Sequence, residues 1–181
     1  MVEWCDSVED ILKLWAEKSA AYRAMHLRSY MRWNFITNAI YIPIIVASSV
    51  SGMMSFGNTD QENAEIISYA IGTINVVVGI LTSILKFLRC EEKCNSHRLS
   101  ARGYGSYHRT IIMEMSLNRQ HREKAEDFCR LSKIDFDRLH DEALPISDDV
   151  VKWYTNTFDN DRVNLPELGI GSMSIKINRN A

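Results

Sequence analysis

NFITNAIYIPIIVASSVSGMMSFGNT, residues 34–59, contains no Asp, Glu, Lys or Arg, and a second uncharged stretch, IISYAIGTINVVVGILTSIL, follows at residues 66–85. A hydrocarbon core about 30 Å thick is crossed by roughly 20 apolar residues in a helix. Both stretches are that long, so the sequence predicts an all-α membrane protein with spans at residues 34–57 and 66–88. The alternative is a buried helical pair in a soluble core, but core helices usually keep a polar face.

Basic residues flank the two stretches and do not occur in the segment between them, residues 58–65. That loop is acidic, with Asp60, Glu62 and Glu65. The basic flanks consist of Lys18, Arg23, Arg28 and Arg32 before the first stretch and Lys86, Arg89, Lys93, Arg98 and Arg102 after the second. Because cytoplasmic flanks are enriched in Lys and Arg, we expect both termini on the cytoplasmic side and the loop on the opposite side.

The composition limits the remaining possibilities. A chain of 181 residues has room for one domain, and its net charge of −2 gives no case for nucleic-acid binding. The first ten residues, MVEWCDSVED, lack the basic region of a signal peptide, so we expect the first span to act as its own insertion signal. All four cysteines fall on the predicted cytoplasmic side, where thiols stay reduced.

Apolar, aromatic and histidine residues recur at spacings of four and three in the segments outside the spans, residues 4–33 and 89–118. This spacing places them on one face of each helix. The predicted seam consists of Trp4, Val8, Ile11, Trp15, Tyr22, His26, Cys94, His97, Tyr104, His108 and Ile111. We expect both helices to continue from the spans without a break and to pack as an antiparallel stalk about 45 Å long. Gly103 and Gly105 weaken the second helix and favour a bend there.

The C-terminal part is expected to form short helices at residues 119–157 and an extended or disordered tail at residues 158–181. The first of these helices covers residues 119–142, with Ile134–Asp135 as the candidate point for a break, and the second is capped by Ser147 and docks its aromatic face on the stalk. Residues 1–157 thus make a single helical domain. In the tail, Met173–Ile177 alternates apolar and polar residues, which suits a strand added to a partner's sheet edge or a disordered segment. The residues predicted to dock on a partner are Trp153, Tyr154, Leu165, Leu168, Ile170, Ile175 and Ile177.

Small and uncharged polar residues recur within both spans. Small residues four apart allow helices in lipid to approach closely. The predicted packing positions are Ala47, Ser48, Ser51, Gly52, Ser68, Gly72, Asn75, Gly79 and Ser83. A pore lining is the alternative interpretation of the polar positions. Helix packing is favoured, since no ionisable residue lies at the middle of either span.

No catalytic motif is found in the chain, so we expect no enzyme activity and no cofactor. Cys90, Cys94 and His97 share one helix face, which would suit a metal ion. The same residues belong to the apolar seam, where small thiols and half-buried histidines are ordinary, so no metal site is expected. Gly103-Tyr104-Gly105 lacks the strand and the Lys-Ser/Thr of a phosphate-binding loop.

The layout as a whole resembles a known family. An aromatic and basic helix leads into IPIIVASSVSGMMSF, an acidic loop follows, the second span ends in LTSILKFL, and LPISDDVVKWY closes the helical part. Over residues 8–154 this resembles the two-transmembrane SLATT-like proteins, especially the versions encoded by large icosahedral nucleocytoplasmic DNA viruses.

The resemblance implies two alternative functions. A virus-encoded member would be a structural component that anchors the internal membrane of the virion, derived from host membrane, to capsid or shell proteins, with both termini facing the capsid. A member of a cellular defence system would be an effector that forms homo-oligomers through its spans and perturbs the lipid bilayer. The long stalk, the tail and the absence of ionisable residues in the spans favour the structural role.

Overall fold

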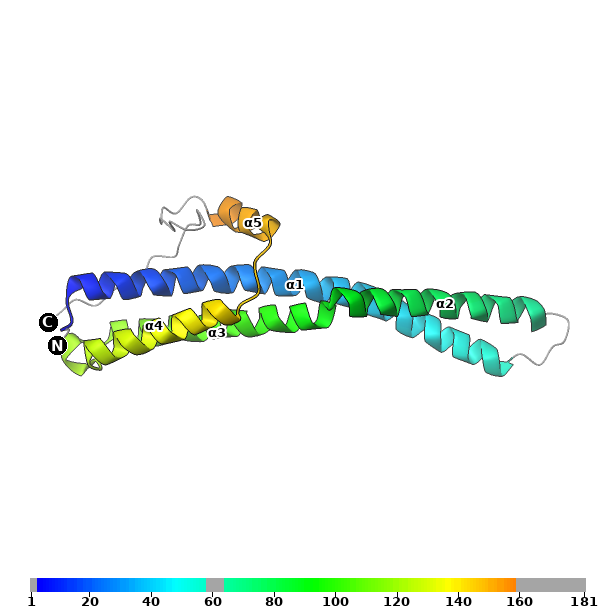
Figure 1. Ribbon diagram of the computed structural model, residues 1–181, viewed down its shortest axis with the longest axis horizontal. Helices are drawn as coiled ribbons and strands as arrows, with labels where there is room; N and C mark the ends of the chain where they lie inside the picture. The colour runs from blue at the N-terminus through cyan, green and yellow to red at the C-terminus, as the bar shows by residue number, and fades with distance from the viewer. Residues whose placement is uncertain (1–2, 58–63, 159–181) are drawn as a thin grey trace. The chain divides into compact units, whose positions relative to one another are not determined.

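The computed structural model describes residues 3–57 and 64–158, which form helices and no strand. The elements are α1 (Asp6–Gly57), α2 (Ala64–Leu88), α3 (Cys90–Ser116), the 3-10 helix η2 (Arg119–His121), α4 (Ala125–Glu142) and α5 (Asp148–Phe158) (Figure 1). Most of the predicted acidic loop and the predicted docking residues Leu165, Leu168, Ile170, Ile175 and Ile177 lie outside the described residues.

The chain divides into two compact units, which are described separately. The first, here called the helical unit, comprises Met1–Tyr30 and Asn95–Ala181. The second, here called the apolar unit, is Met31–Cys94. It contains the two uncharged stretches of the sequence.

α1 is continuous from Asp6 to Gly57, as the sequence predicts for the passage from the amphipathic segment into the first apolar stretch. No glycine occurs in it before Gly52, and Pro43 is accommodated inside the helix. Long helices tolerate an internal proline where neighbouring groups satisfy the freed carbonyl.

The expected continuity between the second apolar stretch and the following helix is wrong. α2 ends at Leu88 and α3 begins at Cys90, because Arg89 between them has a φ of 50°. This left-handed conformation is rare for residues with a Cβ and interrupts the regular helix. A backbone hydrogen bond from Arg89 N to Lys86 O closes the last turn of α2.

The predicted helix over residues 119–142 also differs in its boundaries. The interruption lies at Arg122–Lys124, between η2 and α4, and α4 runs through Ile134–Asp135 without a break. α3 likewise runs through both of its glycines. A Cβ added at Gly103 would collide with Leu139, so this glycine allows close approach of α4.

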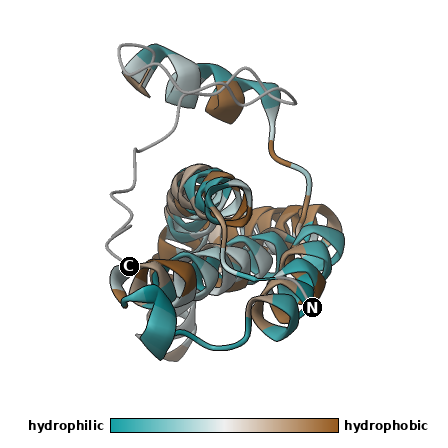
Figure 2. Ribbon diagram, turned by 90° about the vertical axis from the view of Figure 1, so that its left-hand side faces the viewer, coloured by the Kyte–Doolittle hydropathy of each residue, from teal (hydrophilic) through white to brown (hydrophobic). Residues whose placement is uncertain are grey.

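In the helical unit, α1 lies between α5 on one side and the layer of α3 and α4 on the other, as Figure 2 shows. The core toward α3 and α4 is formed by Leu12, Ala16, Tyr107, Ile111, Met115 and Phe128. The core toward α5 is formed by Ala21, Met25, Val150 and Tyr154. Contacts on two sides of α1 explain why its buried surface is wider than the predicted single seam. Met25 is buried toward α5, and Leu12 and Ala16 are buried toward α3 and α4, although the pattern did not select these residues.

Candidate functional site

The apolar unit exposes most of its apolar side chains. α1 and α2 each contain a window long and apolar enough to cross a membrane, and only 6% of each window is buried. Exposed large apolar residues include Phe35, Ile42, Ile45, Val46, Met53 and Phe56 on α1 and Ile66, Tyr69, Val76, Val77, Ile80 and Phe87 on α2. Core helices of soluble proteins bury their apolar faces, and monomeric soluble proteins rarely expose patches of this size.

Polar side chains in these helices are largely satisfied within the helix itself. Hydroxyl groups donate to the backbone carbonyl four residues earlier in the pairs Thr37–Trp33, Ser49–Ile45, Ser55–Ser51, Thr73–Tyr69, Thr82–Val78 and Ser83–Gly79. A hydroxyl bonded in this way needs no water. The polar residues of these helices are therefore compatible with an apolar surrounding.

A side-chain hydrogen bond joins α1 to α2: the Ser51 hydroxyl donates to Asn75 Oδ1 at 3.1 Å. Both residues are among the predicted packing positions. The other predicted positions on α2, Ser68, Gly72, Gly79 and Ser83, are exposed in the single chain. No described atom lies within 4 Å of a Cβ added at Gly52, Gly72 or Gly79. The small residues of α2 thus form an open face.

Aromatic and charged side chains meet near the boundary of the apolar stretches, still within the apolar unit. The Lys93 ammonium lies 4.6 Å from the centre of the Trp33 ring, and the Tyr41 hydroxyl donates to Glu91 Oε1 at 2.8 Å. Trp and Tyr are enriched where an apolar layer meets water. The arrangement is typical of an interfacial belt.

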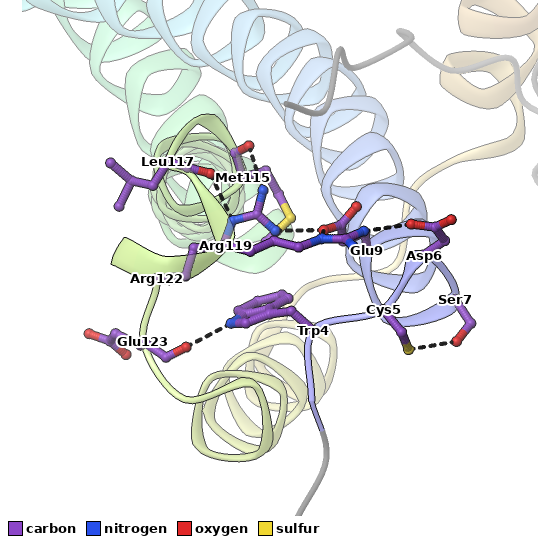
Figure 3. Close-up of polar contacts among 10 residues, drawn as sticks. All are labelled: Trp4, Cys5, Asp6, Ser7, Glu9, Met115, Leu117, Arg119, Arg122 and Glu123. Atoms are coloured by element: carbon purple, nitrogen blue, oxygen red, sulfur yellow. Dashed lines mark hydrogen bonds and ion pairs between the residues drawn. The ribbon is translucent and has the colours of Figure 1, made fainter. Parts of the chain in front are cut away.

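A buried ion cluster holds the end of the helical unit where α1 begins. Glu9 is fully buried, and its Oε1 accepts hydrogen bonds from Arg119 Nε and Arg122 Nη1, each at 2.7 Å (Figure 3). Burial raises the pKa of Glu9, but the hydrogen bonds from both arginines outweigh it and hold the pKa below its usual value. Glu9 is therefore a carboxylate at neutral pH.

Arg122 connects this cluster to the surrounding backbone. Its Nε donates to Leu117 O at 2.9 Å, and its guanidinium lies 5.0 Å from the centre of the Trp4 ring. The Trp4 Nε1 in turn donates to Glu123 O at 2.8 Å (Figure 3). Hydrogen bonds on several sides and stacking on an aromatic ring offset the free-energy cost of removing a guanidinium from water. The cluster ties α1 to the segment between α3 and α4.

Two buried histidines face each other in the helical unit, close to its limits at Tyr30 and Asn95. His26 Nδ1 and His97 Nδ1 lie 2.9 Å apart, so one ring donates and the other accepts. Tyr104 stacks on His26 with ring centres 5.6 Å apart. Burial, with a smaller contribution from His97, lowers the pKa of His26 to about 4, and burial also lowers the pKa of His97. The pair is neutral at physiological pH.

Most other predicted seam residues lie in the helical unit. Val8 and Trp15 pack against the core, Ile111 and Tyr104 are buried, and His108 Nδ1 lies 2.8 Å from Ala16 O. Ile11 is an error of the prediction, since half of its surface is exposed. Cys94 belongs to the apolar unit, where its thiol lies 4.0 Å from Asn34 Oδ1.

The proposed partner-docking residues of α5 have different surroundings from those expected. Tyr154 is buried against α1, and Trp153 is partly covered by the Arg28 guanidinium, 5.0 Å from its ring centre. Tyr154 is therefore part of the core of the helical unit and is not offered to a partner. This agrees with docking of the aromatic face on the neighbouring helix.

Within residues 3–57 and 64–158, no group of three or more His, Cys, Asp or Glu side chains converges on a position for a metal ion. Glu9 with its arginines, and His26 with His97, are buried acid–base groups that make contacts between helices. The sequence pattern did not predict that Glu9 is buried, because acidic residues in the first turn of a helix are usually exposed to solvent.

Comparison with family models, with curated proteins and with solved structures finds no match to this chain.

Proposed function

We propose that this chain is an integral membrane protein whose apolar unit is a two-span hairpin and whose helical unit, on the cytoplasmic side, anchors the membrane to a protein partner. The observation that carries the proposal is the exposure of the long apolar window in each of α1 and α2, of which only 6% is buried within the chain. A bilayer would cover this surface. The hydroxyls bonded within their own helices and the Trp33 and Tyr41 contacts support the same conclusion.

The proposed partner is a component of a protein shell, and the proposed membrane is the internal membrane of a virion. The support comes from the resemblance of the sequence to virus-encoded SLATT-like proteins and from the distribution of basic residues, which favours both termini on the cytoplasmic side. Shells that assemble on the cytosolic face of a membrane would meet the helical unit. That unit is built like a spacer: the Glu9 cluster joins its helices at the end where α1 begins, and the histidine pair joins α1 to α3 near the limit of the unit at Tyr30 and Asn95.

Cross-linking mass spectrometry on the native membrane tests the anchoring function. The lysines to follow are Lys124 and Lys152 in the helical unit and Lys86 and Lys93 in the apolar unit. We expect Lys124 and Lys152 to link mainly to a different, abundant protein, which would be the partner. Links from all four lysines only to other copies of this chain would contradict an anchor and favour the second function.

That second function is a membrane-perturbing effector that assembles through its spans. One observation favours it: the small-residue face of α2 is open, since no atom of another described element lies within 4 Å of a Cβ added at Gly72 or Gly79. Such a face allows a helix of another copy to approach closely. Self-association through this face would also be compatible with an anchor, so oligomerisation alone does not distinguish the two functions.

Replacing both Gly72 and Gly79 with leucine is expected to abolish most self-association in the membrane, because the new side chains fill the open face and keep a second helix away. The measurement is the fraction of disulfide- or chemically cross-linked oligomer in vesicles. The matched control is Val77→Leu, which adds bulk at an exposed position on another side of α2. An unchanged oligomer fraction in the double variant would exclude this face as the contact.

A further inference from the structure

The helical unit has a groove between α3 and α4, and the floor of this groove is the outer side of the core described above. Its volume is about 460 Å³. The floor is made of buried or nearly buried apolar side chains, Tyr107, Ile111 and Phe128. Met113 and Leu131 line the groove with exposed side chains, 71% and 49% accessible. Apolar groups on both the floor and the edges make this a surface suited to covering by another segment.

The rim of the groove is predominantly acidic. Glu114, Glu123 and Asp135 line it, against one basic residue, Arg138. Arg138 is already engaged by Asp135 at 3.3 Å and by Glu142 at 3.8 Å. A segment that fits the groove must therefore combine apolar side chains with Lys or Arg and carry no acidic residue that would neutralise them.

The length of the groove favours a short extended segment. Its lining on α3 extends from Gly103 to Glu114, which corresponds to about 16 Å of helix. Five residues in an extended conformation span about the same distance. Ser106, a small residue of α3 that lines the groove, leaves room for a backbone beside it, whereas the space above Gly103 is occupied by Leu139 of α4.

The chain itself contains a segment with the required chemistry. MSIKINR, residues 173–179, has Met173, Ile175 and Ile177 at alternate positions and carries Lys176 and Arg179, with no Asp or Glu after Glu167. Alternate side chains of an extended chain point to one side. Fourteen residues separate Phe158 from Met173, and such a tether reaches up to about 50 Å, while α3 with its 27 residues is about 40 Å long.

We propose that the α3–α4 groove is a docking surface for an extended basic and apolar segment and that its occupant is residues 173–179 of the same chain. The tether raises the effective concentration of this segment to the millimolar range, so a weak intrinsic affinity is sufficient for occupancy. The same surface would accept a partner segment of the same chemistry once the tail leaves. The inference does not depend on the membrane proposal, because it concerns the helical unit alone.

The test uses the chain in lipid nanodiscs, either full length or ending at Phe158, and a fluorescent synthetic peptide of residues 169–181. The truncated chain is expected to bind the peptide, and the full-length chain to bind it about tenfold or more weakly, because the tethered segment competes. Leu131→Arg in the truncated chain should abolish binding. Leu99→Arg is the matched control, since Leu99 is an exposed leucine of α3 that does not line the groove.

Each other outcome overturns the proposal. Absence of binding to the truncated chain would exclude the segment as a ligand, and binding that survives Leu131→Arg would place it elsewhere. Equal binding to both chain lengths would show that the tail does not occupy its own groove, leaving the groove to another chain. A peptide with Lys176→Glu and Arg179→Glu should bind at least tenfold more weakly, because it loses its attraction to the acidic rim.

The Leu131→Arg variant needs a control for folding. Circular dichroism should show the same helix content in this variant as in the unaltered truncated chain.

Discussion

Replacing Arg122 with alanine is expected to destabilise the helical unit by about 3–5 kcal/mol. The side chains of Arg122 and Glu9 are both fully buried and 2.7 Å apart, so the substitution leaves a buried carboxylate with Arg119 as its remaining arginine partner. It also removes the hydrogen bond to Leu117 O and the stacking on Trp4. For a unit of this size, the melting temperature should fall by more than about 10 °C.

The measurement is thermal unfolding of the full chain in nanodiscs, followed by circular dichroism and by the reaction rate of the half-buried Cys129 thiol. Arg138→Ala is the matched control, because this arginine is exposed and pairs with the exposed carboxylates of Asp135 and Glu142. Exposed pairs contribute up to about 1 kcal/mol, so the control should melt close to the unaltered protein. Equal melting temperatures for the two variants would mean that the Glu9 cluster does not hold the unit together.

Acidification from pH 7.5 to pH 5 is expected to destabilise the helical unit by roughly 2 kcal/mol through the histidine pair. The folded pKa of His26 lies at about 4, below the usual histidine value of 6.5, so the unfolded chain binds the proton more readily. The stabilising contribution is therefore complete above pH 6.5 and is lost as the pH falls from 6.5 toward 4. His97, whose pKa is also lowered, adds to the loss in the same direction. Glu9 contributes little above pH 5, since its pKa is held below the usual value of a glutamate.

The pH dependence of the melting temperature measures this effect. His26→Phe keeps a ring against Tyr104 but cannot take up a proton, so its melting temperature should vary less than half as much between pH 7.5 and pH 5. His121→Gln, at an exposed histidine outside the pair, should leave the pH dependence unchanged. A pH dependence in His26→Phe equal to that of the unaltered chain would exclude the pair as its origin.

Much of the secondary structure could be predicted from the sequence because it depends on local patterns. The two uncharged stretches identify long apolar helices by length alone, and the absence of glycine before Gly52 predicts the continuity of α1. Ser147 predicts the start of α5 at Asp148. The break at Arg89 could not be predicted, because a positive φ at an arginine carries no sequence signal.

The contacts within the helical unit were only partly predictable. His26, His97 and Tyr104 follow the helical repeat and are buried, but the pattern does not tell which of them touch. Glu9 and Arg122 are separated by more than a hundred residues, and neither stands in a motif. α5 buries a second side of α1, so Met25 and Ala21 enter the core outside the predicted seam. Such assignments depend on tertiary packing and not on local spacing.

The most direct test of the proposed membrane topology is labelling of single cysteines in sealed vesicles with a membrane-impermeant maleimide. Two versions of the chain are compared, one retaining only the exposed Cys5 and one carrying only Gln61→Cys, in the segment between the two apolar stretches. We expect Cys5 to react from the cytosolic face in intact vesicles and the cysteine at position 61 to react only after permeabilisation. Reaction of both cysteines from the cytosolic face in intact vesicles would contradict a two-span membrane protein.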